Sequence, residues 1–158
     1  MQVPNQDQAL IDAINRLADA VSGRGKASPA LTDDTANAFV YDADSKNLRA
    51  VDRVAAPAID LLMGIDRAKN TLLENTKRFA NGFSANNALL WGARGMGKST
   101  LIKAIHRTIV EEKDASAPAL VEIHREDISA LPALLGKLRK ADRLFIVFCD
   151  DLSFNRPD

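Results

Sequence analysis

Short apolar runs alternate with longer amphipathic stretches through the second half of the chain. The runs at residues 88–91, 119–123 and 144–149 are almost continuously apolar, like strands that are buried on both faces of a parallel sheet. Between them, apolar residues recur at helical spacing, which predicts helices over residues 98–112 and 130–140. In the second helix, four leucines are expected to face inward: Leu131, Leu134, Leu135 and Leu138. This alternation predicts an α/β fold, in which helices flank a parallel sheet of three core strands.

Before residue 88, the sequence predicts elements that lie outside the three core strands. Apolar positions at helical spacing indicate helices over residues 6–21 and 66–80. The stretch 22–29 combines glycine, charge and proline, which indicates a flexible linker. Short apolar runs at residues 38–41 and 48–51, with turn-forming residues between them, predict a small hairpin.

These patterns divide the chain into three parts. Residues 1–30 are expected to form an N-terminal helix and a linker, and residues 31–61 a small hairpin or extended region. Residues 62–158 are expected to form a partial α/β domain. The first helix fits a separately docked arm or an ordinary packing helix, and its amphipathic stripe favours packing.

Composition narrows the class of protein. The 158 residues suit about one domain, and 46% hydrophobic with 27% charged residues is typical of a soluble globular protein. The 21 basic and 21 acidic residues cancel, so no global field favours a nucleic acid as partner. Cys149 is the only cysteine, which excludes an intramolecular disulfide. No apolar stretch reaches the roughly 18 residues of a membrane helix, so we expect a cytoplasmic protein without a membrane partner.

A glycine-rich loop of spacing Gly-x-x-x-x-Gly-Lys-Ser follows the first predicted core strand and opens a predicted helix. Glycines let the loop backbone approach oxygen atoms closely, and inward amide hydrogens together with a helix N-terminus form an anion site. We expect Lys98 to reach the β- and γ-phosphates of a nucleotide, Ser99 to ligate magnesium, and Thr100 to lie near the α-phosphate. The binding residues are Gly92, Ala93, Arg94, Gly95, Met96, Gly97, Lys98, Ser99 and Thr100. The motif predicts a site for a nucleoside triphosphate, ATP above all, with Mg²⁺ as cofactor.

An acidic pair follows the third predicted core strand directly. Because ligands of an open parallel sheet lie at the carboxyl ends of its strands, Asp150 and Asp151 should lie on the same side as the loop. We assign Asp150 to magnesium. Asp151 is interpreted as the catalytic base that orients the attacking water, or alternatively as a helix cap behind the site. Cys149, just before the pair, is interpreted as a small buried strand residue.

Together, the loop and the acidic pair resemble the AAA+ branch of the P-loop ATPases. A closer resemblance is to an uncharacterised bacterial family of predicted ATP-binding proteins, domain of unknown function 815, and it covers roughly residues 38–158. The similar segments are residues 62–67, 74–79, 85–92, 127–128 and 131–132. The resemblance implies that Met63 and Ile65 line an adenine pocket, although core packing before a helix would explain both equally well.

The resemblance also implies elements that we do not find in this sequence. AAA+ proteins place a further strand between the loop strand and the acidic strand, and they carry a polar sensor, an arginine finger and a helical lid. Without the middle strand, its two neighbours would lie about 10 Å apart, with costly unpaired edges. We therefore expect a fragment of a longer protein. Hydrolysis by this piece alone is not expected, because phosphoryl transfer usually needs an arginine as well.

Three functions remain open on the sequence. The first is a magnesium-dependent AAA+-type ATPase whose full-length form acts on an unknown macromolecular partner, and which could assemble as a homo-oligomer. The second is a nucleotide-gated binding module without turnover. The third is a nucleic-acid-dependent ATPase of loader or initiator type, which the neutral composition does not favour. A small-molecule kinase would need a substrate pocket and lid that no motif marks. His106 and His124 have no partners at metal-ligand spacing and are interpreted as structural.

Overall fold

The computed structural model describes residues 36–113, 116–150 and 152. The helix expected over residues 6–21 and the linker after it lie outside the described residues. The elements follow one another in the order β1 (Ala38–Asp42), β2 (Asn47–Ala50), η1 (Ile59–Leu61), α2 (Asp66–Ala80), α3 (Lys98–Lys113), β3 (Ala119–Ile123), η3 (Arg125–Ala130), α4 (Leu131–Leu138) and β4 (Phe145–Cys149). The α/β class expected from the sequence is confirmed.

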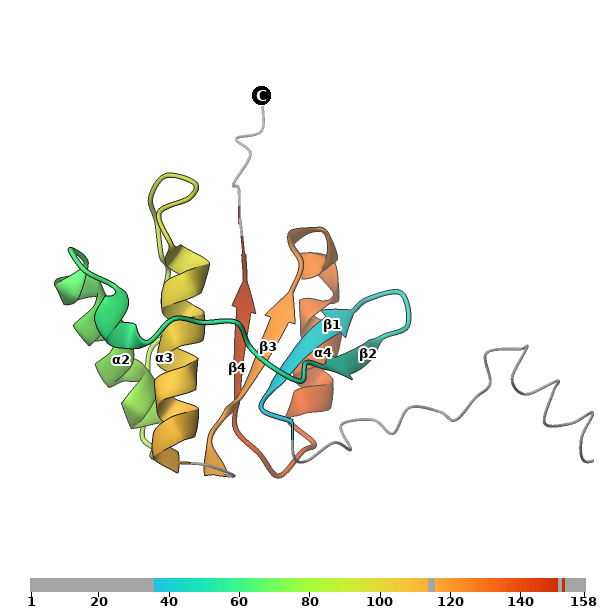
Figure 1. Ribbon diagram of the computed structural model, residues 1–158. Helices are drawn as coiled ribbons and strands as arrows, with labels where there is room; N and C mark the ends of the chain where they lie inside the picture. The colour runs from blue at the N-terminus through green and yellow to red at the C-terminus, as the bar shows by residue number, and fades with distance from the viewer. Residues whose placement is uncertain (1–35, 114–115, 151, 153–158) are drawn as a thin grey trace, which may run out of the picture. The chain divides into compact units, whose positions relative to one another are not determined.

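The sheet has four strands in the order β2-β1-β3-β4 (Figure 1). The predicted hairpin is confirmed as the antiparallel pair β1–β2, and it extends the sheet because β1 also pairs in parallel with β3. β3 and β4 are parallel, with Leu120 beside Ile146. Pairing between β1 and β3 therefore joins the hairpin region to the part of the chain that carries the later strands.

The prediction of one of the three core strands is wrong. Residues 83–91 form no strand, and the apolar side chains of Leu89 and Trp91 are 65% and 89% exposed. The prediction of a strand over residues 88–91 followed from local apolar character, but a strand also needs a neighbour to accept its backbone hydrogen bonds. No strand of the described part of the chain pairs with this run. The sheet is therefore built from the hairpin and the two later strands.

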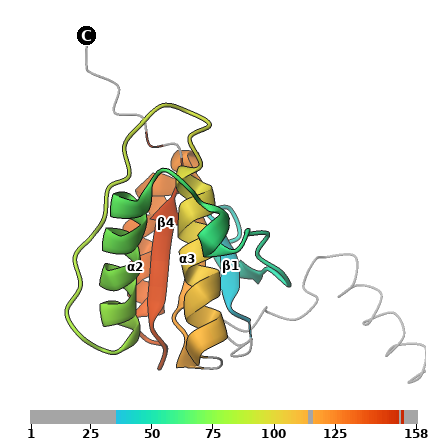
Figure 2. The same ribbon diagram turned by 60° about the vertical axis from the view of Figure 1, so that its left-hand side comes forward.

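The two long helices pack side by side over one face of the sheet. α3 buries Leu101, Ile105 and Ile109 in an apolar cluster with Ala80, the last residue of α2. Figures 1 and 2 show that α2 and α3 begin at the same end of the molecule, where the arrows of β3 and β4 also point. The extended stretch between the helices returns the chain along the outside of α2 to that end (Figure 2).

The short helix α4 lies against the opposite face of the sheet (Figure 1). It was expected to turn four leucines inward, and it buries two of them, Leu134 and Leu138, at 0% and 6% exposure. Leu131 is half-buried, whereas Leu135 is 37% exposed. With only two turns, α4 can present only a narrow stripe to the sheet.

Arg143 ties together the starting points of three strands. Its guanidinium donates hydrogen bonds to the Ala36 carbonyl at 2.7 Å and to the Asn37 side-chain oxygen at 2.7 Å, just before β1. A further bond of 3.3 Å reaches the Ala117 carbonyl, just before β3. Because Leu144 alone separates Arg143 from β4, one planar donor group links the N-terminal ends of β1, β3 and β4.

Replacing Arg143 with alanine should lower the free energy of unfolding by about 2 kcal/mol, since hydrogen bonds from a charged donor contribute about 1.5–3 kcal/mol and partly buried acceptors lose their partner. Urea unfolding followed by circular dichroism measures this. Arg139→Ala is the matched control, because Arg139 is exposed at the end of α4. Equal stability of the two variants would contradict the role given to Arg143.

Candidate functional site

The glycine-rich loop leads directly into α3, as the sequence predicts. Gly95 and Gly97 have positive φ angles of 80° and 77°, a conformation that residues with side chains adopt only under strain. The helix begins at Lys98, and the first hydrogen bond of the turn runs from the Leu101 amide to the Gly97 carbonyl at 2.8 Å. The positive glycine angles therefore bend the chain just ahead of a helix N-terminus, where free amide groups gather.

Lys98 folds back over the loop that precedes it. Its ammonium group donates hydrogen bonds to the carbonyl oxygens of Gly92 at 3.1 Å and Ala93 at 2.9 Å. The first turn of α3 contains no acidic residue, so no carboxylate of that turn offsets the positive end of the helix. A cation and a helix N-terminus thus face the same loop, which is the arrangement that holds an anion.

The other loop residues are open to solvent. Ala93, Arg94 and Met96 are exposed, while Ser99 and Thr100 are half-buried in the first turn of α3. The loop lies at the end of the sheet to which β3 and β4 point (Figure 1). Asp150 follows β4 directly and is exposed at that same end. The structure thus brings the loop and Asp150 to one end of the sheet, while Asp151 lies outside the described residues.

Negative charge gathers around the carboxyl end of β4. Burial raises the pKa of the Cys149 thiol above its ordinary value of 9.0, and the neighbouring carboxylates of Asp150, Glu126 and Glu122 raise it further. A thiol with a raised pKa stays protonated and is a poor nucleophile. Cys149 ends β4 as expected, but the expectation that it is buried is wrong. It is half-buried, because β4 pairs only with β3 among the described strands.

An ion pair that the sequence did not reveal links α3 to the sheet near the site. Lys103, one turn beyond Ser99, bonds to the Glu122 carboxylate on β3 at 3.2 Å. The same ammonium lies 5.6 Å from the centre of the Phe148 ring on β4, within range of a cation–π contact. The pair connects the first half of α3 to the sheet. Glu122 is the only charged residue of its strand, but that pattern does not identify Lys103 as its partner.

The two residues assigned to an adenine pocket differ in their surroundings. Ile65 is half-buried and packs against the apolar cluster of α3 that contains Leu101. Met63 is 85% exposed in the segment just before α2. That segment lies at the same end of the molecule as the loop, because α2 and α3 begin there (Figure 2).

The two histidines differ in their surroundings. His106 on α3 is 2% exposed, and its Nε2 donates a hydrogen bond to the Pro118 carbonyl at 3.0 Å. Burial lowers the pKa of His106 below 6.5, and the charge of Arg143 lowers it further, although the bond to Pro118 acts in the opposite direction. His124 is exposed between β3 and η3. No group of three metal-binding side chains occurs among the described residues.

Acid should destabilise the fold through His106. Because the pKa is lower in the folded state, the unfolded chain binds a proton more readily, so stability is full above pH 6.5 and falls as the pH drops below it. We expect urea midpoints to decrease from pH 7.5 toward pH 5, and His106→Gln to reduce that slope. His124→Gln serves as the control. A slope that is unchanged in His106→Gln would assign the acid sensitivity to other groups.

The fold and the loop define an α/β protein with a mostly parallel sheet and a cationic, glycine-rich turn at the carboxyl end of its strands. The chain belongs to the family described as Protein of unknown function (DUF815), whose model matches residues 34–158. Neither the curated proteins nor the solved structures gave a match to the chain. In the described part of the chain, no helix is long and apolar enough to cross a membrane.

Proposed function

We propose that this chain binds a nucleoside triphosphate, ATP above all, together with Mg²⁺, through the loop from Gly92 to Ser99. The observation that carries the proposal is the position of Lys98, whose ammonium lies against the Gly92 and Ala93 carbonyls at the N-terminus of α3. This places a positive charge and free helical amides around one small turn. A polyphosphate is the ligand that matches such a donor set most closely.

Binding would exchange one set of contacts for another. Lys98 would release its two carbonyl partners and donate instead to phosphate oxygens, which are stronger acceptors because they are charged. The loop amides would donate to the same oxygens. Gly95 and Gly97 keep the turn open to the ligand, because neither position has any heavy atom within 4 Å of where a Cβ would stand.

The chemistry of the remaining side chains fits a magnesium ion. Ser99 and Asp150 offer hard oxygen ligands at the same end of the sheet, and Mg²⁺ usually takes only one or two protein ligands beside phosphates and water. Bound magnesium would neutralise charge on the phosphates. We further propose that Met63 is covered by the base when the nucleotide binds, since its side chain is exposed in the segment before α2.

For the whole protein we propose an AAA+-type ATPase that acts on a macromolecular partner. The glycine-rich loop and Asp150, which lie at the same end of the sheet, support this proposal. Asp151 would orient the attacking water, and an arginine from elsewhere would stabilise the transferring phosphoryl group. The described residues would bind the nucleotide and the metal ion. Turnover would depend on the added arginine.

Trp91 gives a direct test, because it is the only tryptophan of the chain, is 89% exposed and immediately precedes the loop. We expect its fluorescence to change saturably with ATP, and Mg²⁺ to increase the affinity. Asp150→Asn should remove most of the magnesium effect, about tenfold, if one charged ligand contributes about 1.4 kcal/mol. Asp142→Asn, at an exposed site before β4, is the control. Absence of binding by an independent method, or a magnesium effect that survives in Asp150→Asn, would contradict the assignment.

A further inference from the structure

The first turn of α2 carries a lysine that is largely withdrawn from solvent. The Lys69 side chain is only 16% exposed, whereas lysine ammonium groups usually stay in water. Its ammonium donates a hydrogen bond of 3.0 Å to the Leu62 carbonyl and lies 2.9 Å from the Asp66 carboxylate. Hydrogen bonding to Lys69, and then its charge, lower the pKa of the Asp66 carboxyl. The ammonium thus contacts the start of its own helix and the chain just before it.

The chain just before α2 forms a hook, defined by residues 59–65. It begins with the turn of η1 and reaches α2 through a bend at Gly64, whose φ is 77°. Lys69 contacts the chain on both sides of this bend. Its ammonium binds the Leu62 carbonyl ahead of the bend, and its backbone amide donates to the Ile65 carbonyl behind it at 2.9 Å. Lys69 therefore ties the hook across the point where glycine leaves the backbone most free.

The hook has an inner and an outer face. The side chains of its inner face pack against the apolar cluster that α2 and α3 share, and they are Ile59, Leu62 and Ile65. That cluster includes Leu101, whose amide closes the first turn after the glycine-rich loop. On the outer face, the side chains of Leu61 and Met63 are 71% and 85% exposed. The hook therefore presents Met63 to solvent at the end of the molecule where the loop lies (Figure 2).

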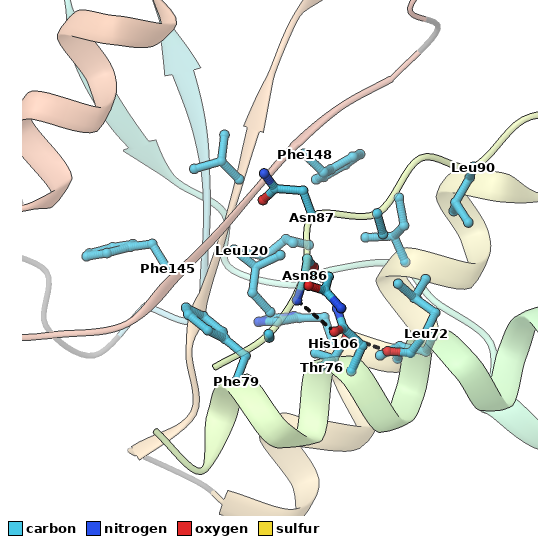
Figure 3. A pocket seen from close by; sticks show the side chains of 17 residues that line it. Leu72, Thr76, Phe79, Asn86, Asn87, Leu90, His106, Leu120, Phe145 and Phe148 are labelled. Atoms are coloured by element: carbon cyan, nitrogen blue, oxygen red, sulfur yellow. Dashed lines mark hydrogen bonds between the residues drawn. The ribbon is translucent and has the colours of Figure 1, made fainter. Parts of the chain in front are cut away.

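The glycine-rich loop has a separate attachment to the same helix. In the middle of α2, the Asn75 side chain donates to the Asn86 carbonyl at 2.8 Å and accepts from the Asn86 amide at 2.9 Å. Figure 3 shows Asn86 with Leu72 and Thr76 of α2 among the residues that line one pocket. Asn86 belongs to the extended segment that leads to the loop. Because these contacts do not involve Lys69, a change at Lys69 should leave the loop in place.

We propose that Lys69 is a positioning residue for the base of the nucleotide, because it holds the hook in the conformation in which Met63 lies against the base. The inference rests on the proposed function and concerns the base side of that site. Without the tie, the glycine bend would sample many conformations, and binding would have to order the hook. A segment that is ordered before binding adds affinity because this cost is avoided. The loop would hold the phosphates with or without the tie.

Titration calorimetry with ATP and with tripolyphosphate, each with Mg²⁺, separates the base side of the site from the phosphate side. Lys69→Leu removes the ammonium with little change in helix propensity. We expect this variant to bind ATP about tenfold more weakly and tripolyphosphate less than about twofold more weakly, because only ATP needs an ordered hook. Lys69→Arg keeps a charged donor and should bind ATP more tightly than Lys69→Leu does.

Lys77→Leu is the matched control on the same helix. Lys77 pairs with Glu112 at 2.6 Å, so the control removes the same charge and also breaks an ion pair. Both affinities should stay at the wild-type value. If neither ligand binds the wild-type chain, the proposed function fails and this inference fails with it. If both ligands bind and Lys69→Leu weakens both equally, or neither, the proposed function stands and the role of Lys69 is overturned.

Methionine methyl groups show where the base lies. Met63 is in the hook, and Met96 is in the loop, where its side chain is 64% exposed. In NMR spectra of methyl-labelled methionine, we expect the Met63 signal to shift with ATP and not with tripolyphosphate, and the Met96 signal to shift with both. In Lys69→Leu, saturating ATP should shift Met63 less and Met96 as before. A Met63 signal that responds equally to both ligands, or that keeps its full ATP shift in Lys69→Leu, would overturn the inference.

Discussion

Replacing Lys98 with alanine is expected to weaken ATP binding by about a hundredfold, because two hydrogen bonds from a charged donor at about 1.5 kcal/mol each are lost. The fold should be unaffected, since among the described residues the Lys98 ammonium donates hydrogen bonds to the loop carbonyls of Gly92 and Ala93 and to no other element. Helix propensity should also be kept, as alanine is the most favourable residue in a helix. Titration calorimetry of both proteins with ATP and Mg²⁺ measures the difference.

Lys113→Ala is the matched control for that experiment. Lys113 is the last residue of the same helix, at the end away from the loop. Removing it changes the net charge as much as Lys98→Ala does, so a general electrostatic effect would appear in both variants. Similar losses of affinity in the two would show that the loop lysine has no special position in binding.

The largest expected change in stability is at Leu134. Its side chain is fully buried between α4 and the sheet, so truncation to alanine leaves a cavity and should lower the free energy of unfolding by about 3–4 kcal/mol. Total stabilities of about 5–15 kcal/mol make this a large part of the whole. α4 has only eight residues, and it depends on this contact because so short a helix is not stable alone. Urea unfolding gives the value.

Leu135→Ala distinguishes packing from helix propensity. The two leucines are adjacent in α4, but Leu135 is 37% exposed. Its truncation removes less apolar area and leaves no enclosed cavity, so a loss under about 1 kcal/mol is expected. If the two substitutions cost the same, α4 is not anchored through Leu134.

Local periodicity in the sequence was sufficient to predict much of the secondary structure. The helix expected over residues 66–80 begins and ends where α2 does, and the strand expected over residues 119–123 coincides with β3. Both have strong signals: a long amphipathic stripe that glycine ends, and an apolar run bounded by polar residues. The inward face of α4 was overestimated, because four leucines cannot all face one sheet from two helical turns.

Long-range pairing was the part that local patterns did not determine. Nothing near residues 38–42 indicates that β1 pairs in parallel with β3, about 80 residues later in the chain. The apolar run at residues 88–91 failed for the same reason, since pairing depends on a distant neighbour.

The candidate site also has one part that the local sequence predicts and one part that depends on long-range contacts. The loop was located from the sequence, because fixed glycine spacing before a helix reports local backbone geometry. Its positive φ angles at Gly95 and Gly97 agree with that expectation. The pair between Lys103 and Glu122 joins a helix to a strand and could be found only from the folded chain. Neither part of the site establishes hydrolysis, which stays a proposal.

The most direct test of triphosphate binding compares ATP with adenosine. Titration calorimetry of the whole chain with Mg²⁺ should show ATP bound at one site at least about a hundredfold more tightly than adenosine, because the loop and Lys98 contact phosphates. AMP should lie between the two. Equal affinities for ATP and adenosine, or the absence of any ATP binding, would contradict the account.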